Sequence, residues 1–272
     1  MKKKVILLIS AVLFIYTSQA QCPARENLQQ GIDKIYFSKT LSPTEQLGPL
    51  SAYLDTIRNC SYKNDSTHAY LLRVIGSRYG AMEDYFTAVQ YYRQSADIII
   101  LNAGKTSINR QHLLRCYYWL MEYYDLLNNP KEKMKAADSC IAIARQYNSL
   151  STAEGLRVLD EKIEYYFDRG DYHRCIDEAK LCEKVAMDYI QAGENPDFGK
   201  RVISTSLGWH VKALLLLKDS EQAEKLISNK IDEYTKAGLK NYLGLIYVQL
   251  AEVQLLKGNH QNALRFYNQG LK

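Results

Sequence analysis

A spaced pattern of large and small residues occurs twice in this 272-residue chain. The first copy comprises Leu72, Ile75, Gly76, Tyr79, Ala88, Tyr92 and Ser95. The second begins 175 positions later and comprises Tyr247, Leu250, Ala251, Gln254, Ala263, Tyr267 and Gly270. Only Gln254, in the place of Tyr79, departs from the large or small class of its counterpart. Such internal repetition is typical of a stack of similar supersecondary units.

The spacing within each copy predicts two helices that pair. The first four positions fall at i, i+3, i+4 and i+7, which is one face of a helix. The last three repeat that spacing on a second helix, and the short segment 80–84, which begins with glycine, joins the two. We therefore expect an antiparallel helical hairpin. One hairpin cannot bury its apolar stripe alone, so it needs neighbours on which to stack.

The small-large-small triplet of the second helix recurs between the two copies. The five triplets are Ala88, Tyr92 and Ser95; Ala137, Ile141 and Ala144; Cys175, Ala179 and Cys182; Ala223, Ile227 and Lys230; and Ala263, Tyr267 and Gly270. Ala179 is small where a large residue is expected, and Lys230 is polar. Each later triplet follows a turn signal and a candidate first helix. These features predict five stacked hairpins.

This pattern resembles the tetratricopeptide repeat (TPR) over residues 69–272, in two good copies and three degenerate ones. In the second copy, Tyr124 and Asp125 stand where the large-small pair is expected. The steps between successive triplets are 49, 38, 48 and 40 residues, longer than the family's period of about 34. The resemblance implies an all-α fold, a right-handed α-solenoid whose helices or loops are longer than the family standard.

Residues 1–20 have the form of a secretory signal peptide, with three lysines, an apolar run and small residues before the expected cleavage site after Ala20. The apolar run is short for a membrane span of about 20 residues. An uncleaved anchor and a lipoprotein anchored at Cys22 are the alternatives. We expect an exported chain, periplasmic or secreted, that has no membrane partner once the signal is cleaved.

Removing the signal peptide also removes three lysines, so the formal net charge falls from +5 to +2. The remaining chain is nearly neutral and has no stripe of Lys and Arg. It therefore gives no support for a nucleic-acid partner.

Residues 21–68 are expected to form an N-terminal helical cap, with helices over 24–38 and 43–59. If these two helices pair antiparallel, Cys22 at the start of one comes close to Cys60 at the end of the other. In an oxidising compartment the two cysteines would form a disulfide that holds the cap together. The other interpretation is two free cysteines.

Neither catalysis nor a metal or cofactor site is predicted from the residues. Cys175 and Cys182 occupy positions where helix packing needs a small residue. Asp160 and Glu164 share a helix face, as paired carboxylates for acid-base work would. Arg157 lies on the same face, which favours a solvated, salt-bridged stripe. The histidines lack metal-ligand spacing, and the chain has no glycine-rich phosphate loop.

The resemblance implies that the first helices line a concave surface and that partners contact their exposed residues. These candidates are Arg73 and Ser77; Arg115, Tyr118 and Glu122; Arg157, Asp160 and Glu164; Thr205 and Lys212; and Val248 and Glu252. Because their charges are of mixed sign, an extended peptide or protein segment is a more suitable partner than a polyanion.

The sequence thus predicts a non-enzymatic, exported scaffold that docks a partner segment on its concave face. The last triplet finishes at Lys272 with no polar capping helix after it, so we also expect a packing partner on this uncapped face. The alternative is that the chain is the sensor or regulatory segment of a longer signalling protein. Resembling arrays precede histidine-kinase, helix-turn-helix or CHAT domains.

Overall fold

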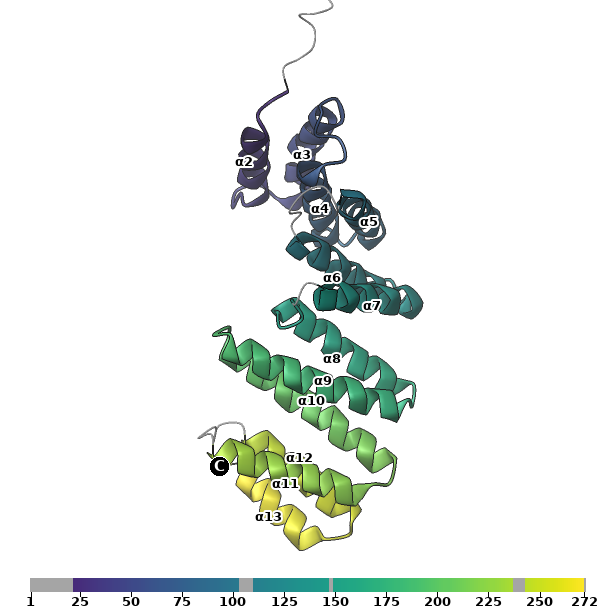
Figure 1. Ribbon diagram of the computed structural model, residues 1–272, viewed down its shortest axis with the longest axis vertical. Helices are drawn as coiled ribbons and strands as arrows, with labels where there is room; N and C mark the ends of the chain where they lie inside the picture. Colours follow the sequence, from purple (N-terminus) through teal and green to yellow (C-terminus); the bar gives the residue numbers. More distant parts are fainter. Residues whose placement is uncertain (1–21, 103–109, 147–148, 237–242, 272) are drawn as a thin grey trace, which may run out of the picture. The chain divides into compact units, whose positions relative to one another are not determined.

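The computed structural model describes residues 22–102, 110–146, 149–236 and 243–271, and over these residues it contains twelve helices and no strand (Figure 1). The predicted signal peptide lies outside the described residues. The helices are α2 (Arg25–Tyr36), α3 (Pro43–Arg58), α4 (Ser66–Ala81), α5 (Tyr85–Asn102), α6 (Arg110–Leu126), α7 (Pro130–Gln146), α8 (Ala153–Asp168), α9 (Tyr172–Gln191), α10 (Pro196–Leu216), α11 (Ser220–Lys236), α12 (Leu243–Leu256) and α13 (His260–Gly270).

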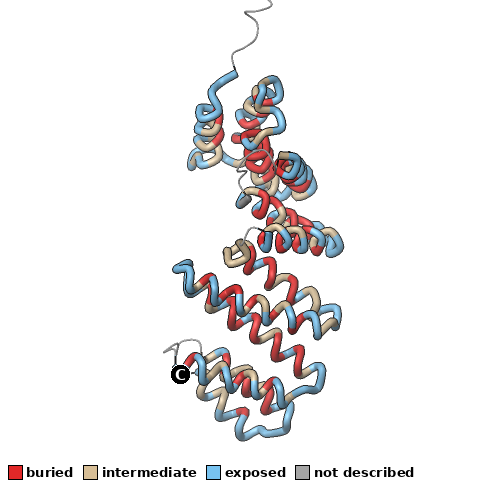
Figure 2. Tube along the Cα trace, viewed as in Figure 1, coloured by how far each residue is buried: buried red, intermediate tan, exposed pale blue. Residues whose placement is uncertain are grey.

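The chain divides into two compact units, residues 1–128 and residues 129–272. In the first unit, α3 and α5 pack on α4, and α6 packs on α5. In the second unit, α7 to α13 pack each on the next, and the first helices α8 and α12 also contact α10. Buried and exposed residues alternate along the helices (Figure 2), as expected of helices that pack on neighbours along one side. The predicted all-α helical repeat fold is confirmed.

The turns inside the five hairpins share one local construction. Each contains a residue with positive φ, followed by an aspartate or asparagine at the start of the second helix. The positive-φ residues are Glu83, Asn128, Gly170, Lys218 and Gly258. The left-handed conformation ends the first helix, and in four of the five turns the following side chain accepts a hydrogen bond that caps the second helix, whereas Asn259 makes no such bond. For example, Asp84 Oδ1 accepts a hydrogen bond from Thr87 N–H at 3.1 Å.

Small residues at the predicted positions let the paired helices approach. In the first unit Ala88, Tyr92 and Ser95 are all buried. A Cβ atom added at Gly76 would lie 2.8 Å from Cδ2 of Tyr92, which is too close without a shift of the ring. The Ser95 hydroxyl donates to the carbonyl oxygen of Ala69 at 2.7 Å. The spacing of large and small residues therefore specifies which side chains meet between the two helices of this hairpin.

The turns also correct the expected register of the second copy. Ile75 and Gly76 lie eight and seven residues before the turn residue Glu83. The same offsets from Asn128 lead to Leu120 and Met121, which are 3% and 0% exposed. Placing this pair at Tyr124 and Asp125 was therefore wrong by four residues, since Leu120 and Met121 are buried at the offsets of the first repeat and Asp125 is exposed.

The third and fourth repeats are degenerate because they bury charged and polar groups at a core position. Lys162 and His210 lie eight residues before their turn residues, where the first repeat has Ile75. The Lys162 ammonium lies 3.0 Å from Asp138 Oδ1 and 3.0 Å from Glu178 Oε1. Burial alone would lower the pKa of Lys162, but these two carboxylates outweigh it and raise the pKa.

Glu183 supplies the corresponding charge beside His210. Its Oε2 lies 3.3 Å from the ammonium of Lys230, the polar residue of the fourth triplet. Its Oε1 lies 3.8 Å from His210 Nδ1. Since Lys230 is paired with Glu183, the array tolerates a lysine where the repeat pattern calls for a small residue.

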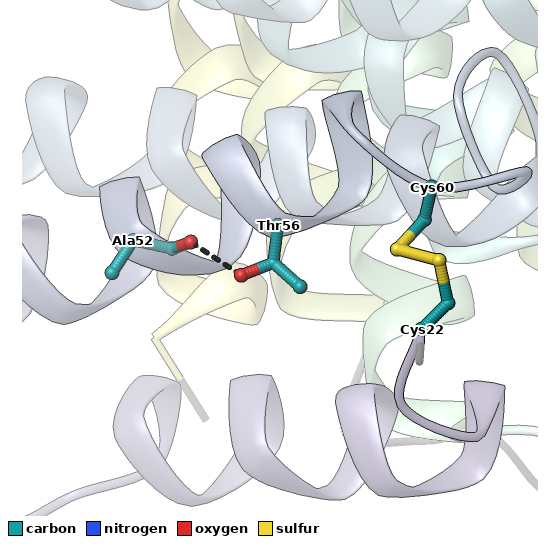
Figure 3. The surroundings of a disulfide bond; sticks show 4 residues. All are labelled: Cys22, Ala52, Thr56 and Cys60. Carbon is teal, nitrogen blue, oxygen red and sulfur yellow. Dashed lines mark hydrogen bonds between the residues drawn. A yellow bond between two sulfur atoms is a disulfide. The ribbon is translucent and has the colours of Figure 1, made fainter. Parts of the chain in front are cut away.

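The N-terminal helices form a hairpin held by a covalent bond. Cys22 and Cys60 are joined by a disulfide with a Cα–Cα distance of 5.7 Å (Figure 3). Arg25 at the start of α2 pairs with Asp65 at 2.7 Å, and Ser42 forms a capping box with Glu45 at the start of α3. The other four cysteines are buried.

The last helix, α13, buries Ala263 but leaves Leu264 and Leu271 exposed by 63% and 85%. Across the part of the chain that the structure describes, none of the helices combines the length and the apolar character needed to span a bilayer.

Candidate functional site

The predicted partner-facing residues occupy equivalent positions of the first helices. The candidates that lie six positions before the turn residue are Ser77, Glu122, Glu164, Lys212 and Glu252. The candidates that lie ten positions before it are Arg73, Tyr118, Asp160 and Val248, and the candidates that lie thirteen positions before it are Arg115, Arg157 and Thr205. Residues four or seven positions apart lie on the same face of a helix, so the candidates on each first helix lie on one side of that helix.

In the first unit, packing takes up part of this face. The expectation that Arg73 and Tyr118 are exposed was wrong, since they are only 8% and 6% exposed. The Arg73 guanidinium lies 5.1 Å from the centroid of the Tyr70 ring, so its aliphatic stem and charge are held within the helix packing. The Tyr118 ring packs edge-on against Trp119 at 5.3 Å.

The remaining candidates of the first unit differ in exposure. Ser77 is half-buried, and its hydroxyl lies 3.4 Å from the Tyr36 hydroxyl of α2. Glu122 is half-buried, whereas Arg115 is exposed. The N-terminal hairpin therefore reaches the predicted face of α4 and reduces the surface that a partner could contact there.

On α8, Arg157 and Glu164 are exposed, but Asp160 is half-buried. Its Oδ1 atom is buried and accepts no hydrogen bond from any described residue. Burial, with smaller contributions from Glu161 and Glu164, raises the pKa of Asp160 to about 6. The Arg157 guanidinium lies 5.8 Å from the Phe198 ring centroid. Asp160 is therefore not part of a fully solvated stripe, contrary to the expectation.

The clearest site is a groove along α10 and α12, both in the second unit. It consists of two adjoining cavities of about 400 Å³ and about 330 Å³ that share Lys212 and Glu252. We call it the α10–α12 groove. Phe167, Leu215, Leu216, Leu255 and Leu256 line its apolar half, and Ser204, Thr205, Gly208, Trp209, Leu245, Val248 and Gln249 line its mixed half.

The apolar half lies where the first helices end. Leu215 and Leu216 finish α10, Leu255 and Leu256 finish α12, and Phe167 comes from the end of α8. Leu216 and Leu256 remain 52% and 69% exposed. Clustered exposed leucines beside a cavity indicate a contact surface, whereas single exposed leucines do not.

In the mixed half, Gly208 lies directly against the side chain of Gln249. A Cβ atom added there would lie 2.8 Å from Nε2 of Gln249, so any larger residue would require this side chain to shift. Gln249 Nε2 donates to the carbonyl oxygen of Ser204 at 3.4 Å. The Ser204 hydroxyl and Gln249 Oε1 are buried and have no hydrogen-bond partner among the described residues.

Two charged side chains stand between the halves. Lys212 is exposed, and its ammonium lies 4.9 Å from the Trp209 ring centroid. Glu252 is half-buried on the facing helix. These are two of the residues that the sequence analysis placed on the partner-facing side, and Thr205 and Val248 line the same groove.

Trp209, Phe167 and the leucines of the apolar half were not predicted from the sequence as site residues. The available signal was a run of leucines directly before a turn, at 214–217 and again at 255–256. Such a run is typical of the end of an apolar helix face. Only the packing of α8, α10 and α12 shows that these side chains surround one cavity.

The buried thiols are poor nucleophiles. Burial raises the pKa of Cys175 to about 11 and that of Cys182 to about 12, so both stay protonated near neutral pH. Over the described ranges, no three His, Cys, Asp or Glu side chains gather in a way that could hold a metal ion.

Several solved structures share this fold. The chain is similar to BtubC (BKLC) from P. vanneervenii, with a TM-score of 0.56 and 11% identity over 85% of this chain and 90% of that chain. It is similar to a putative kinesin light chain with nearly identical TPR-like repeats from Podosopora anserina, with a TM-score of 0.52 and 14% identity over 75% and 94%. The apo form of RapI aligns with a TM-score of 0.51 and 13% identity over 99% and 91%.

At these identities the likeness concerns the fold alone. The chain has the fold of TPR-like helical repeat proteins. No protein-family model matches the sequence. No curated protein matches it either.

Proposed function

We propose that this protein is an exported scaffold that binds a partner protein by docking a segment of it in the α10–α12 groove. The observation that carries the proposal is the groove itself, with leucines exposed at one end and unpaired charged and polar groups at the other. Binding sites typically combine a largely apolar concave surface with a few polar groups that orient the ligand. Export is supported by the form of residues 1–20 and by the Cys22–Cys60 disulfide.

Site-specific photo-crosslinking in the source cells tests the docking proposal. A photoreactive residue at Thr205, which is exposed within the groove, should give a discrete crosslinked protein. The same residue at Lys180, exposed on α9 and absent from the groove lining, is the matched control. Equal crosslinking at the two positions, or none at Thr205, would refute the assignment of the groove.

Cell fractionation tests the export proposal separately. We expect the protein outside the cytoplasm, with a mature N-terminus that mass spectrometry places after Ala20. A chain that stays in the cytoplasm with Met1 to Ala20 intact would contradict export without affecting the docking proposal.

A further inference from the structure

We infer that the α10–α12 groove selects an extended peptide of about five or six residues with a defined pattern of side chains. The pattern is an acidic side chain that pairs with Lys212, a basic side chain that pairs with Glu252, and a large apolar side chain that enters the apolar half. This inference rests on the proposed docking function and adds to it the chemistry of the partner.

The length follows from the groove. Its lining extends from Ser204 to Leu216 on α10 and from Leu245 to Leu256 on α12. At about 1.5 Å of rise per helical residue, these stretches are about 16 to 18 Å long. An extended chain advances by about 3.3 Å per residue, so five or six residues fill that length.

The two charges define the middle of the peptide. Lys212 and Glu252 lie on facing helices, and neither forms an ion pair with another described residue or with the other. Elsewhere in the second unit, Lys162, Lys230 and Lys257 each pair with a carboxylate from a neighbouring helix. Successive side chains of an extended segment point to opposite sides, so neighbouring acidic and basic residues can reach the two walls together.

The polar floor favours an extended segment over a helix. The Ser204 hydroxyl and Gln249 Oε1 are buried beneath the mixed half without hydrogen-bond partners among the residues described. A helix uses its backbone N–H and C=O groups internally, whereas an extended chain brings these groups unpaired to the surface on which it lies. Only an extended segment therefore offers backbone groups along the whole mixed half of the groove.

The apolar half of the groove accounts for the large apolar side chain of the peptide. Its lining atoms are almost entirely carbon, contributed by Phe167 and by the leucines that end α10 and α12. Its volume of about 400 Å³ is large enough to admit a leucine or an aromatic side chain. Because this half adjoins Lys212 and Glu252, the apolar residue belongs next to the charged pair in the peptide.

Selection from a displayed library of random decapeptides on the full, oxidised chain tests the inference. We expect the selected peptides to share adjacent acidic and basic residues beside a Leu, Phe, Tyr or Trp. Lys212→Glu should weaken the binding of a selected peptide about fivefold to tenfold, because a favourable ion pair becomes a like-charge pair. Replacing the acidic residue of the peptide by lysine should then restore binding to Lys212→Glu. Lys180→Glu, a charge reversal outside the groove, should leave the affinity unchanged.

The outcomes separate the inference from the docking function. Peptides that bind in the groove, as shown by protection of a probe at Thr205, but lack the charged pair and are insensitive to Lys212→Glu would overturn the inferred pattern and leave docking intact. Selected sequences that become helical on binding, seen by circular dichroism, would overturn the extended form. If no peptide binds and Thr205 also captures no partner in cells, the docking function fails together with the inference.

Discussion

Replacing Lys162 by methionine should destabilise the second unit, because it removes the charge that balances a buried carboxylate. Lys162 is 7% exposed, and its ammonium contacts Glu178 Oε1 and Asp138 Oδ1 at 3.0 Å each. The Glu178 side chain is 17% exposed, whereas that of Asp138 is 64% exposed. Methionine keeps most of the length of the side chain and removes the ammonium group, with its charge and its hydrogen-bond donors.

The magnitude depends mainly on Glu178. Removing one partner of a buried ion pair costs about 3 to 5 kcal/mol, since the other charge stays buried without compensation. The exposed Asp138 should contribute less than about 1 kcal/mol, because water screens it. Glu178 Oε2 is already without a hydrogen-bond partner among the described residues, so no second contact compensates for the loss. We expect Lys162→Met to lower the free energy of unfolding by about 3 kcal/mol.

Urea unfolding followed by far-UV circular dichroism measures this change at neutral pH. The double variant Lys162→Met with Glu178→Met should recover most of the loss, because two apolar side chains of similar length replace a buried pair. Lys180→Met, exposed on α9, should change the free energy by less than about 0.5 kcal/mol. A Lys162→Met variant as stable as the wild type, or a double variant less stable than the single one, would refute the reasoning.

Two further changes test the packing and the pH dependence. Gly76→Ala should lower the free energy of unfolding by about 1 to 3 kcal/mol, because its Cβ would lie 2.8 Å from the Tyr92 ring. The control is Gly48→Ala, which should raise the free energy of unfolding slightly because nothing lies within 4 Å of its Cβ. Equal effects of the two substitutions in urea unfolding would contradict the packing argument. Since the pKa of Asp160 is raised to about 6, the wild type should lose stability as pH rises from about 4 to about 6. Asp160→Asn should therefore be more stable than the wild type at pH 8, by about 1 to 3 kcal/mol, but not at pH 4, and a pH-independent difference would exclude Asp160 as the cause.

Much of the fold could be predicted because local spacing carries it. The interval between small and large residues specifies which helix faces meet, so Gly76, Ala88 and Tyr92 were assigned to their contact correctly. The register predicted for the second repeat was wrong. The prediction relied on residue size, whereas the positions of the buried residues follow from their distance to the turn. Asn128 has positive φ, and the offset from it leads to Leu120 and Met121.

The candidate site was predicted only in part. The spacing of a helix identifies which residues share a face, so Thr205, Lys212, Val248 and Glu252 were placed together. Whether a face is open depends on what packs against it. Arg73 lies within the helix packing beside Tyr70, and the α2 residue Tyr36 reaches Ser77, whereas the equivalent face of α10 and α12 contains a groove.

The sequence by itself determined the helical hairpins, their number and the faces on which they meet, because these depend on intervals of three and four residues along one helix. Only the tertiary structure decided which charges are buried in pairs, as at Lys162, and which stay available, as at Lys212 and Glu252. Pairing and burial depend on distances between side chains from different helices. Those distances arise only when the helices pack.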